Sequence, residues 1–392
     1  METGGTVAKG YESVRDAFAQ AQAADPGGAQ LCIYRHGERV VDLWAGRDTA
    51  NERPYTEDSL TILMSCTKGA VAVCAAMLAE RGLLDVEAPV ARYWPQFAAH
   101  GKDTITVAHC LSHSAGLPTF PSAAHITARD LSNWDKCVVA LADATPLWTP
   151  PGAYASYHAV TYGYLVGEVI RRITGQTIGA FFADNIAKPL GLDFWIGLPD
   201  PQQDRVAPHL PPATPVDFRK LMAGAGVNVD DPLMAELLAG FDAITDTIHF
   251  INTPEGRSAE IPAANGIANA RALAKMYAAC IGEVDGVRLL SAETVDRARI
   301  SRTRMLPPLP PMAHLPRPPG EGFGLGFGLT NAVTQMLGAG SFGHDGAGGR
   351  LGFAHPESGI AAGFACNSML WDNVSPDPRW AWVGPLREIA KH

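Results

Sequence analysis

The spacing of apolar residues along this chain predicts strands near both ends and helices between them. Apolar residues that return every three to four positions predict helices over 11–24, 65–81 and 157–174. Alternating side chains on both sides of a tight turn predict a hairpin over 30–48. The longest uninterrupted stretch of apolar residues and glycine lies inside the second helix and is 11 residues long. A stretch of that length suits a buried helix and is too short to span a membrane.

The last quarter of the chain returns to strand-like patterns. Residues 323–330, 350–356 and 359–367 are predicted strands joined by glycine-rich turns, and 378–391 is a predicted terminal helix. The simplest arrangement is an α+β fold in which both chain ends contribute to one antiparallel sheet flanked by helices.

The same order of elements predicts two structural units. We expect residues 1–82 and 263–392 to form the sheet domain together, and residues 83–262 to form an inserted, mostly helical lobe. Ligand sites often lie between two such units.

Composition and charge exclude several classes of protein. The 392 residues are 47% hydrophobic, enough for a large core, and the net charge is −9. Lysine and arginine are scattered, so we expect no nucleic-acid partner. The seven cysteines form no C-x-x-C pair, and residues 1–19 lack the apolar core of a signal peptide. We therefore expect buried, reduced thiols and a cytoplasmic location.

No metal or cofactor is expected from the motifs. His109 and His113 have the i, i+4 spacing of a ligand pair, but the sequence indicates no third ligand. The glycine pattern over 338–343 fits G-x-G-x-x-G, but it leads into a strand, where dinucleotide binding requires a helix. No serine lies in a G-x-S-x-G elbow.

One serine has a spacing that suits nucleophilic catalysis. Ser65 and Lys68 form the only S-x-x-K pattern in the chain, at the start of the helix predicted over 65–81. Residues three apart lie on the same side of a helix, and a lysine desolvated among apolar neighbours is a base that activates a hydroxyl. The alternative is that Ser65 caps the helix and Lys68 is a solvated lysine in its first turn.

Other segments add to this pattern and together resemble the serine β-lactamase and penicillin-binding-protein superfamily. The resemblance is strongest to its class C branch and to family VIII carboxylesterases, and it extends from about residue 30 to the C-terminus. It is carried by S-C-T-K at 65–68, L-S-H-S-A-G-L at 111–117, the tyrosine-containing segment 151–164, N-G-I-A-N-A-R-A-L-A at 265–274 and F-G-H-D-G-A-G-G at 342–349.

The resemblance implies a role for each matched residue. Ser65 would be the acylated nucleophile, with Lys68 as its partner. Tyr157 would be the general base, as a phenolate held by nearby positive charge. The alternatives are that Tyr157 is a core aromatic residue and that the histidine of the third motif belongs to a simple turn.

The third motif of the family falls on His344, Asp345 and Gly346, which we expect to bind substrate at a strand edge. The backbone N–H groups of Ser65 and Ala347 would then face the carbonyl oxygen of the substrate as an oxyanion hole.

Two departures from the family pattern predict the substrate class. Ala159 occupies the position of the asparagine that binds an acyl-side-chain amide in lactamases, and His344 replaces a lysine that grips a carboxylate. Both changes favour a plain carboxylic ester of short to medium chain length, unless Arg350 supplies the missing charge. The open alternatives are an acyltransferase, a β-lactamase or D-amino peptidase, and a non-catalytic scaffold. The expected partner is a small-molecule ester, and a homo-oligomer is possible.

Four aromatic residues are further candidates for lining an acyl pocket, although core packing explains each of them equally well. They are Trp148, Tyr154, Trp371 and Trp380.

Overall fold

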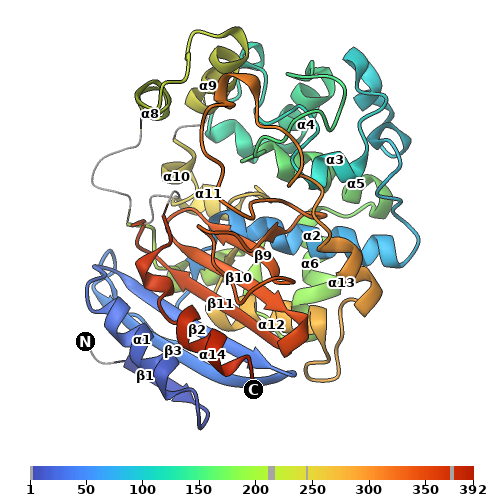
Figure 1. The fold of residues 1–392 in the computed structure, drawn as a ribbon. Helices are drawn as coiled ribbons and strands as arrows, with labels where there is room; N and C mark the ends of the chain where they lie inside the picture. The colour runs from blue at the N-terminus through green and yellow to red at the C-terminus, as the bar shows by residue number, and fades with distance from the viewer. Residues whose placement is uncertain (1–2, 211–216, 244–245, 371–374) are drawn as a thin grey trace.

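The larger sheet of the protein is built from both ends of the chain, which lie side by side in Figure 1. The computed structural model describes residues 3–210, 217–243, 246–370 and 375–392. Eight strands form an antiparallel sheet in the order β1-β3-β2-β11-β10-β9-β8, and β4 pairs with β3. The expected α+β fold with an antiparallel sheet is confirmed.

The strands of this sheet are β1 (Thr3–Val7), β2 (Gly28–Arg35), β3 (Glu38–Asp48), β4 (Arg53–Pro54), β8 (Gly328–Leu329), β9 (Phe342–Gly346), β10 (Arg350–His355) and β11 (Ile360–Cys366). A small second sheet contains β5 (Thr61–Ile62), β7 (Ile267–Ala268) and β6 (Phe194–Trp195). The α-helices are α1 (Glu12–Gln22), α2 (Thr67–Glu80), α3 (Val107–Leu111), α4 (Trp134–Asp143), α5 (Thr161–Thr174), α6 (Ile178–Phe182), α7 (Lys188–Leu190), α8 (Phe218–Gly224), α9 (Pro232–Ala243), α10 (Thr247–Phe250), α11 (Pro254–Ser258), α12 (Ala270–Ile281), α13 (Ala292–Ala298) and α14 (Val383–Ile389).

Both faces of the large sheet are buried. On one face, Leu31 of β2 belongs to an apolar cluster with residues of α1 and α14. On the other face, Cys32 belongs to the main core together with α12. Helix α12 lies close to the sheet because β10 carries glycine at position 352, where a Cβ atom would lie 2.8 Å from the side chain of Leu273.

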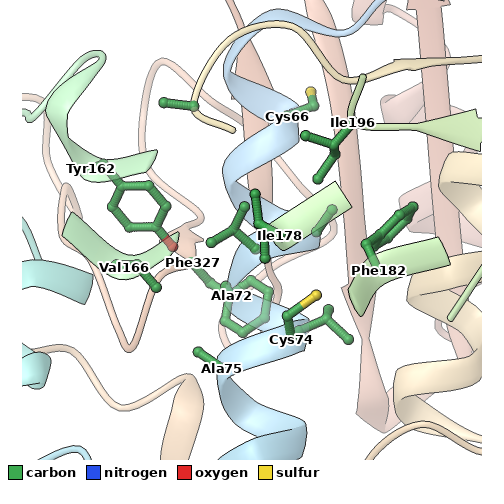
Figure 2. Close-up of a cluster of buried hydrophobic side chains, with 14 of the residues drawn as sticks. Cys66, Ala72, Cys74, Ala75, Tyr162, Val166, Ile178, Phe182, Ile196 and Phe327 are labelled. Carbon is green, nitrogen blue, oxygen red and sulfur yellow. The ribbon is translucent and has the colours of Figure 1, made fainter. Parts of the chain in front are cut away.

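Helix α2 runs through the main core and has apolar neighbours on several sides. In Figure 2, Tyr162 and Val166 of α5 approach it from one side, and Ile178 and Phe182 of α6 from the other. Residues Thr67–Ala75 of this helix are all buried, so tertiary packing stabilises it on all sides over this part. The start of α2 is therefore held rigidly in the core.

Three predicted elements differ from the structure. The terminal helix expected over 378–391 is divided into a short 3₁₀ segment, Pro378–Trp380, and α14. The helix expected over 157–174 begins only at Thr161, because backbone N–H groups of Ser156 and His158 are bonded to His113 and not within a helix. The strand expected over 323–330 is reduced to β8, since Phe323 turns back and forms an isolated bridge with Gly328.

Helices α3–α5 and α8–α11 lie above the large sheet in Figure 1. The domain boundaries at 82/83 and 262/263 stay a prediction. Within the described residues, no helix is both long enough and apolar enough to cross a bilayer. All seven cysteines are buried and unpaired, as expected.

Candidate active site

Ser65 lies in a tight turn that leads directly into α2. The turn is the short 3₁₀ segment Met64–Cys66, and Met64 has a left-handed backbone with φ of 51°. A residue other than glycine adopts this conformation only where surrounding structure enforces it, which is typical of functional sites. Lys68, one turn further on, has its Nζ 3.2 Å from Ser65 Oγ. The structure thus brings together the pair that the S-x-x-K spacing predicts.

Lys68 is held in the interior by backbone carbonyls. Its side chain is 0% exposed, and Nζ lies 2.7 Å from Ala159 O and 2.9 Å from Ala263 O. Burial lowers the pKa of Lys68 to about 7, although the nearby Asp345 acts in the opposite direction. A neutral amine has two N–H groups and one lone pair. In the charged form Nζ donates to Ser65 Oγ and to both carbonyls. In the neutral form the two carbonyls accept hydrogen bonds from both N–H groups, which leaves the lone pair for the Ser65 hydroxyl.

Tyr157 is part of the segment before α5 and faces the same two residues. The Nζ atom of Lys68 lies 4.7 Å from the centroid of its ring. Burial raises the pKa of Tyr157 well above its usual value, and a hydrogen bond with Ser65 offsets this only in part. Burial therefore favours the neutral phenol in the resting protein, and the phenolate implied by the resemblance stays a prediction. The nearby Asp345 acts in the same direction as burial.

The third motif packs against the turn that carries Ser65. The Cys66 thiol donates a hydrogen bond to the carbonyl oxygen of His344 in β9, at 3.1 Å. At Gly346 the two segments approach so closely that a Cβ atom would collide with the carbonyl oxygen of Leu63. Glycine at position 346 is thus required by the close approach of β9 to the Ser65 turn.

Two backbone N–H groups are left without a partner beside this contact. Within the described part of the chain, neither Ser65 nor Ala347 donates a backbone hydrogen bond. Free N–H groups at the nucleophile and at the end of the third motif are the donors that an oxyanion hole needs.

His344 is an uncharged hydrogen-bond acceptor. It is 2% exposed, and its Nδ1 lies 2.6 Å from the carbonyl oxygen of Asp345, so Nδ1 carries the proton. Its Nε2 is buried and has no partner among the described residues. Burial and the nearby Lys68 lower the pKa of His344 to about 3. Burial also raises the pKa of Asp345, whose carboxylate accepts a hydrogen bond from Thr334 at 3.1 Å.

Arg350 does not supply the missing charge for a substrate carboxylate. Its side chain is 0% exposed and donates to the backbone carbonyls of Ile62 and Ala347. Ala159 likewise contributes only its carbonyl oxygen, to Lys68. The two departures from the family pattern are therefore not compensated by these residues.

His113 is a site residue whose role the sequence did not reveal. Its carbonyl oxygen accepts a hydrogen bond from Ser156 N–H at 3.0 Å, and its Nδ1 accepts one from His158 N–H at 3.1 Å. Its ring lies 4.7 Å from the ring of Tyr157. The residues before and after Tyr157, Ser156 and His158, are thus both hydrogen-bonded to His113. His113 lies in the family-like motif at 111–117, which marks the segment in the sequence, but the sequence alone does not show which residues it contacts.

The remaining candidates lie elsewhere. Trp148 and Tyr154 pack with α9 in a separate apolar cluster, and Trp380 is buried in the cluster that covers β2 and β10. Trp371 lies outside the described residues. Among the described residues, no group of three or more His, Cys, Asp or Glu side chains is placed to hold a metal ion.

Sequence comparisons agree with this arrangement of motifs. The family model described as Beta-lactamase matches residues 14–383. The chain is 36% identical over 370 residues to the Esterase/beta-lactamase LipL of Mycobacterium tuberculosis, covering 90% of this chain and 79% of that protein. It is 32% identical over 209 residues to Esterase EstB of Burkholderia gladioli, covering 49% of this chain and 53% of EstB.

Solved structures show the same relationship over the full length. A family VIII carboxylesterase superposes with a TM-score of 0.83 at 33% identity, covering 98% of this chain and 99% of the other. A penicillin-binding protein homologue from Caulobacter crescentus superposes with a TM-score of 0.82 at 33% identity, covering 100% of both chains. With the motifs, the fold and these relatives in agreement, the chain is a hydrolase that belongs to the beta-lactamase family.

Proposed function

We propose that this protein hydrolyses carboxylic esters through a covalent acyl-enzyme on Ser65. The observation that carries the proposal is the position of Lys68 Nζ, 3.2 Å from Ser65 Oγ and hydrogen-bonded to two backbone carbonyls. The esterases LipL and EstB and the family VIII carboxylesterase support the same reaction.

Acylation begins with a proton transfer to Lys68. At neutral pH a substantial fraction of this lysine is an uncharged amine, because its pKa is lowered to about 7. Its lone pair accepts the Ser65 hydroxyl proton while Oγ bonds to the ester carbonyl carbon. The carbonyl oxygen becomes an oxyanion, which accepts hydrogen bonds from the free backbone N–H groups of Ser65 and Ala347.

Tyr157 completes the reaction as a proton donor. Its phenol is neutral and hydrogen-bonded to Ser65, so it protonates the leaving alkoxide as the ester C–O bond breaks, and it regains a proton from the Lys68 ammonium. In deacylation a water molecule attacks the acyl carbon and loses its proton to the same pair. The Ser65–acyl bond then breaks, Ser65 is reprotonated, and the carboxylic acid leaves.

The substrate class follows from what the site does not offer. Ala159 has no side-chain amide, and His344 is neutral because burial lowers its pKa to about 3. A plain ester requires neither an amide partner nor a cation. We therefore propose esters with short to medium acyl chains. The buried, unpaired cysteines support a further proposal, that the protein acts in a reducing compartment such as the cytoplasm.

A panel of p-nitrophenyl esters from acetate to laurate tests this function. We expect release of p-nitrophenol to be fastest with short and medium acyl chains. Liquid chromatography of the products distinguishes free acid from transfer of the acyl group to an added alcohol. Mainly transferred product in dilute alcohol would establish an acyltransferase, and no turnover of any ester would contradict the proposal.

A further inference from the structure

Arg350 bonds to the backbone of both segments that carry the unpaired N–H groups. Its Nε donates to Ile62 O at 3.2 Å, and Ile62 precedes the Ser65 turn. Its Nη1 donates to Ala347 O at 2.8 Å. A guanidinium group is planar and rigid, so two carbonyls bound to its different nitrogens are held at a fixed separation.

We propose that Arg350 is a positioning residue, which sets the distance between the two oxyanion donors at Ser65 and Ala347. This inference rests on the proposed function. The donors stabilise an oxyanion only if both are placed where the tetrahedral oxygen forms. The contact spans two segments far apart in the chain, and it adds to the hydrogen bond between the Cys66 thiol and the carbonyl oxygen of His344.

The two residues after Ala347, Gly348 and Gly349, are also held through their carbonyl oxygens by buried side chains. The carbonyl oxygen of Gly348 accepts a hydrogen bond from Arg379, and that of Gly349 accepts one from Trp380 Nε1 at 2.8 Å. Both glycines have a left-handed backbone, and a Cβ atom at either would overlap a guanidinium group. Three successive carbonyls therefore point toward buried donors, which leaves the Ala347 N–H free to face a ligand.

The charge of Arg350 is not neutralised by a neighbouring carboxylate. Arg379 forms ion pairs with Asp25 at 3.1 Å and Asp377 at 2.7 Å, whereas none of the ion pairs in the described part of the chain involves Arg350. Its Nη2 is 2.8 Å from His209 Nδ1, and burial lowers the pKa of His209 well below its usual value, so that ring is neutral. An uncompensated buried cation is costly for folding. Behind an oxyanion hole, however, it stabilises negative charge in the transition state.

Substitutions of Arg350 test this role, because they should weaken binding of tetrahedral species more than binding of a product that does not use the oxyanion hole. Arg350→Lys keeps the charge but loses the rigid link between two carbonyls, and Arg350→Met loses both. We expect kcat/KM for p-nitrophenyl butyrate to fall at least about tenfold in either variant. The Ki of an alkylboronic acid, which forms a tetrahedral adduct on Ser65, should rise by a similar factor. The Ki of p-nitrophenol, a product that does not use the hole, should change less than about twofold.

A pair of tryptophan substitutions provides a matched test that does not disturb a buried charge. Trp380→Phe removes the donor to Gly349, whereas Trp382→Phe removes an indole N–H that has no partner among the described residues. Both residues lie in the same apolar cluster. We expect Trp380→Phe to weaken boronate binding several-fold and Trp382→Phe to leave it unchanged. This pair tests the neighbouring anchor at Gly349, and Arg350→Lys, which keeps the buried charge, decides the role of Arg350 if Arg350→Met does not fold, as judged by circular dichroism.

The outcomes distinguish this inference from the proposed function. If Ser65→Ala retains wild-type hydrolysis, the acyl-enzyme proposal fails, and this inference fails with it. If hydrolysis depends on Ser65 but boronate Ki is unchanged in folded Arg350→Met or Arg350→Lys, only the positioning role of Arg350 is contradicted. Equal loss of boronate and p-nitrophenol affinity in the Arg350 variants would show general damage to the site and would also contradict it.

Discussion

The Nζ atom of Lys68 lies 4.7 Å from the centroid of the Tyr157 ring, and burial shifts the pKa values of these two groups in opposite directions from their usual values. The lysine pKa is lowered to about 7, so this group is able to accept a proton near neutral pH. The tyrosine pKa is raised, so this group retains its proton. An acceptor and a donor on either side of Ser65 are what ester cleavage requires, since one proton is removed and another is delivered.

Ser65→Ala should abolish ester turnover and covalent labelling by a phosphonate. The substitution removes one oxygen atom in a half-buried turn, so folding should be preserved. Intact-protein and peptide mass spectrometry locate the label in the unmodified protein. Ser112→Ala is a matched control, because the Ser112 hydroxyl donates a hydrogen bond to Ala108 O at 2.7 Å and so has a structural role. A label found on Ser112 or Ser341 would overturn the assignment of Ser65.

Tyr157→Phe should reduce kcat at least about 10²-fold, the usual scale for loss of an acid or base group. The phenyl ring preserves the contacts with His113 and Phe323, so the thermal unfolding midpoint should change little. Steady-state hydrolysis of p-nitrophenyl butyrate measures the loss. A near-normal kcat would mean that Lys68 both accepts and delivers the proton without the phenol.

The pH dependence of hydrolysis should report Lys68. The proposed mechanism needs the neutral amine, and the pKa of this group is lowered to about 7. kcat/KM should therefore fall about tenfold per pH unit below this value and level off above it. The residual activity of Tyr157→Phe should show the same midpoint. A midpoint near 10 in the unmodified protein would instead assign the profile to a phenol or to an unperturbed lysine.

Nitrocefin and penicillins should be poor substrates. A β-lactam brings a carboxylate and usually an amide, and each hydrogen bond lost to a buried partner costs about 1–3 kcal/mol. With no amide at Ala159 and no charge at His344, kcat/KM should be roughly 10²–10⁴ lower than for a short-chain ester. Lowering the pH to about 5.5 should not help, since the pKa of His344 is lowered to about 3. Nitrocefin turnover within tenfold of the best ester would contradict this prediction.

Much of the fold could be predicted because local patterns carry it. The hairpin over 30–48 corresponds to β2 and β3, and the apolar run after Ser65 forms α2. Strand β1 was missed, since Thr3–Val7 contains two glycines and little apolar alternation. Tyr157 was placed on a helix because its neighbours have helical spacing, but hydrogen bonds to His113 hold that segment outside α5.

The sequence by itself determined the motifs, their order and the pairing of Ser65 with Lys68, since residues three apart meet wherever the start of a helix forms. Only the tertiary structure determines that burial lowers the pKa of Lys68 and raises that of Tyr157. The lysine amine is buried and donates hydrogen bonds to the carbonyl oxygens of Ala159 and Ala263, which come from distant segments. It likewise decided that Arg350 faces backbone carbonyls and not a ligand. Protonation states and hydrogen-bond partners depend on burial, which arises only when separate parts of the chain pack together.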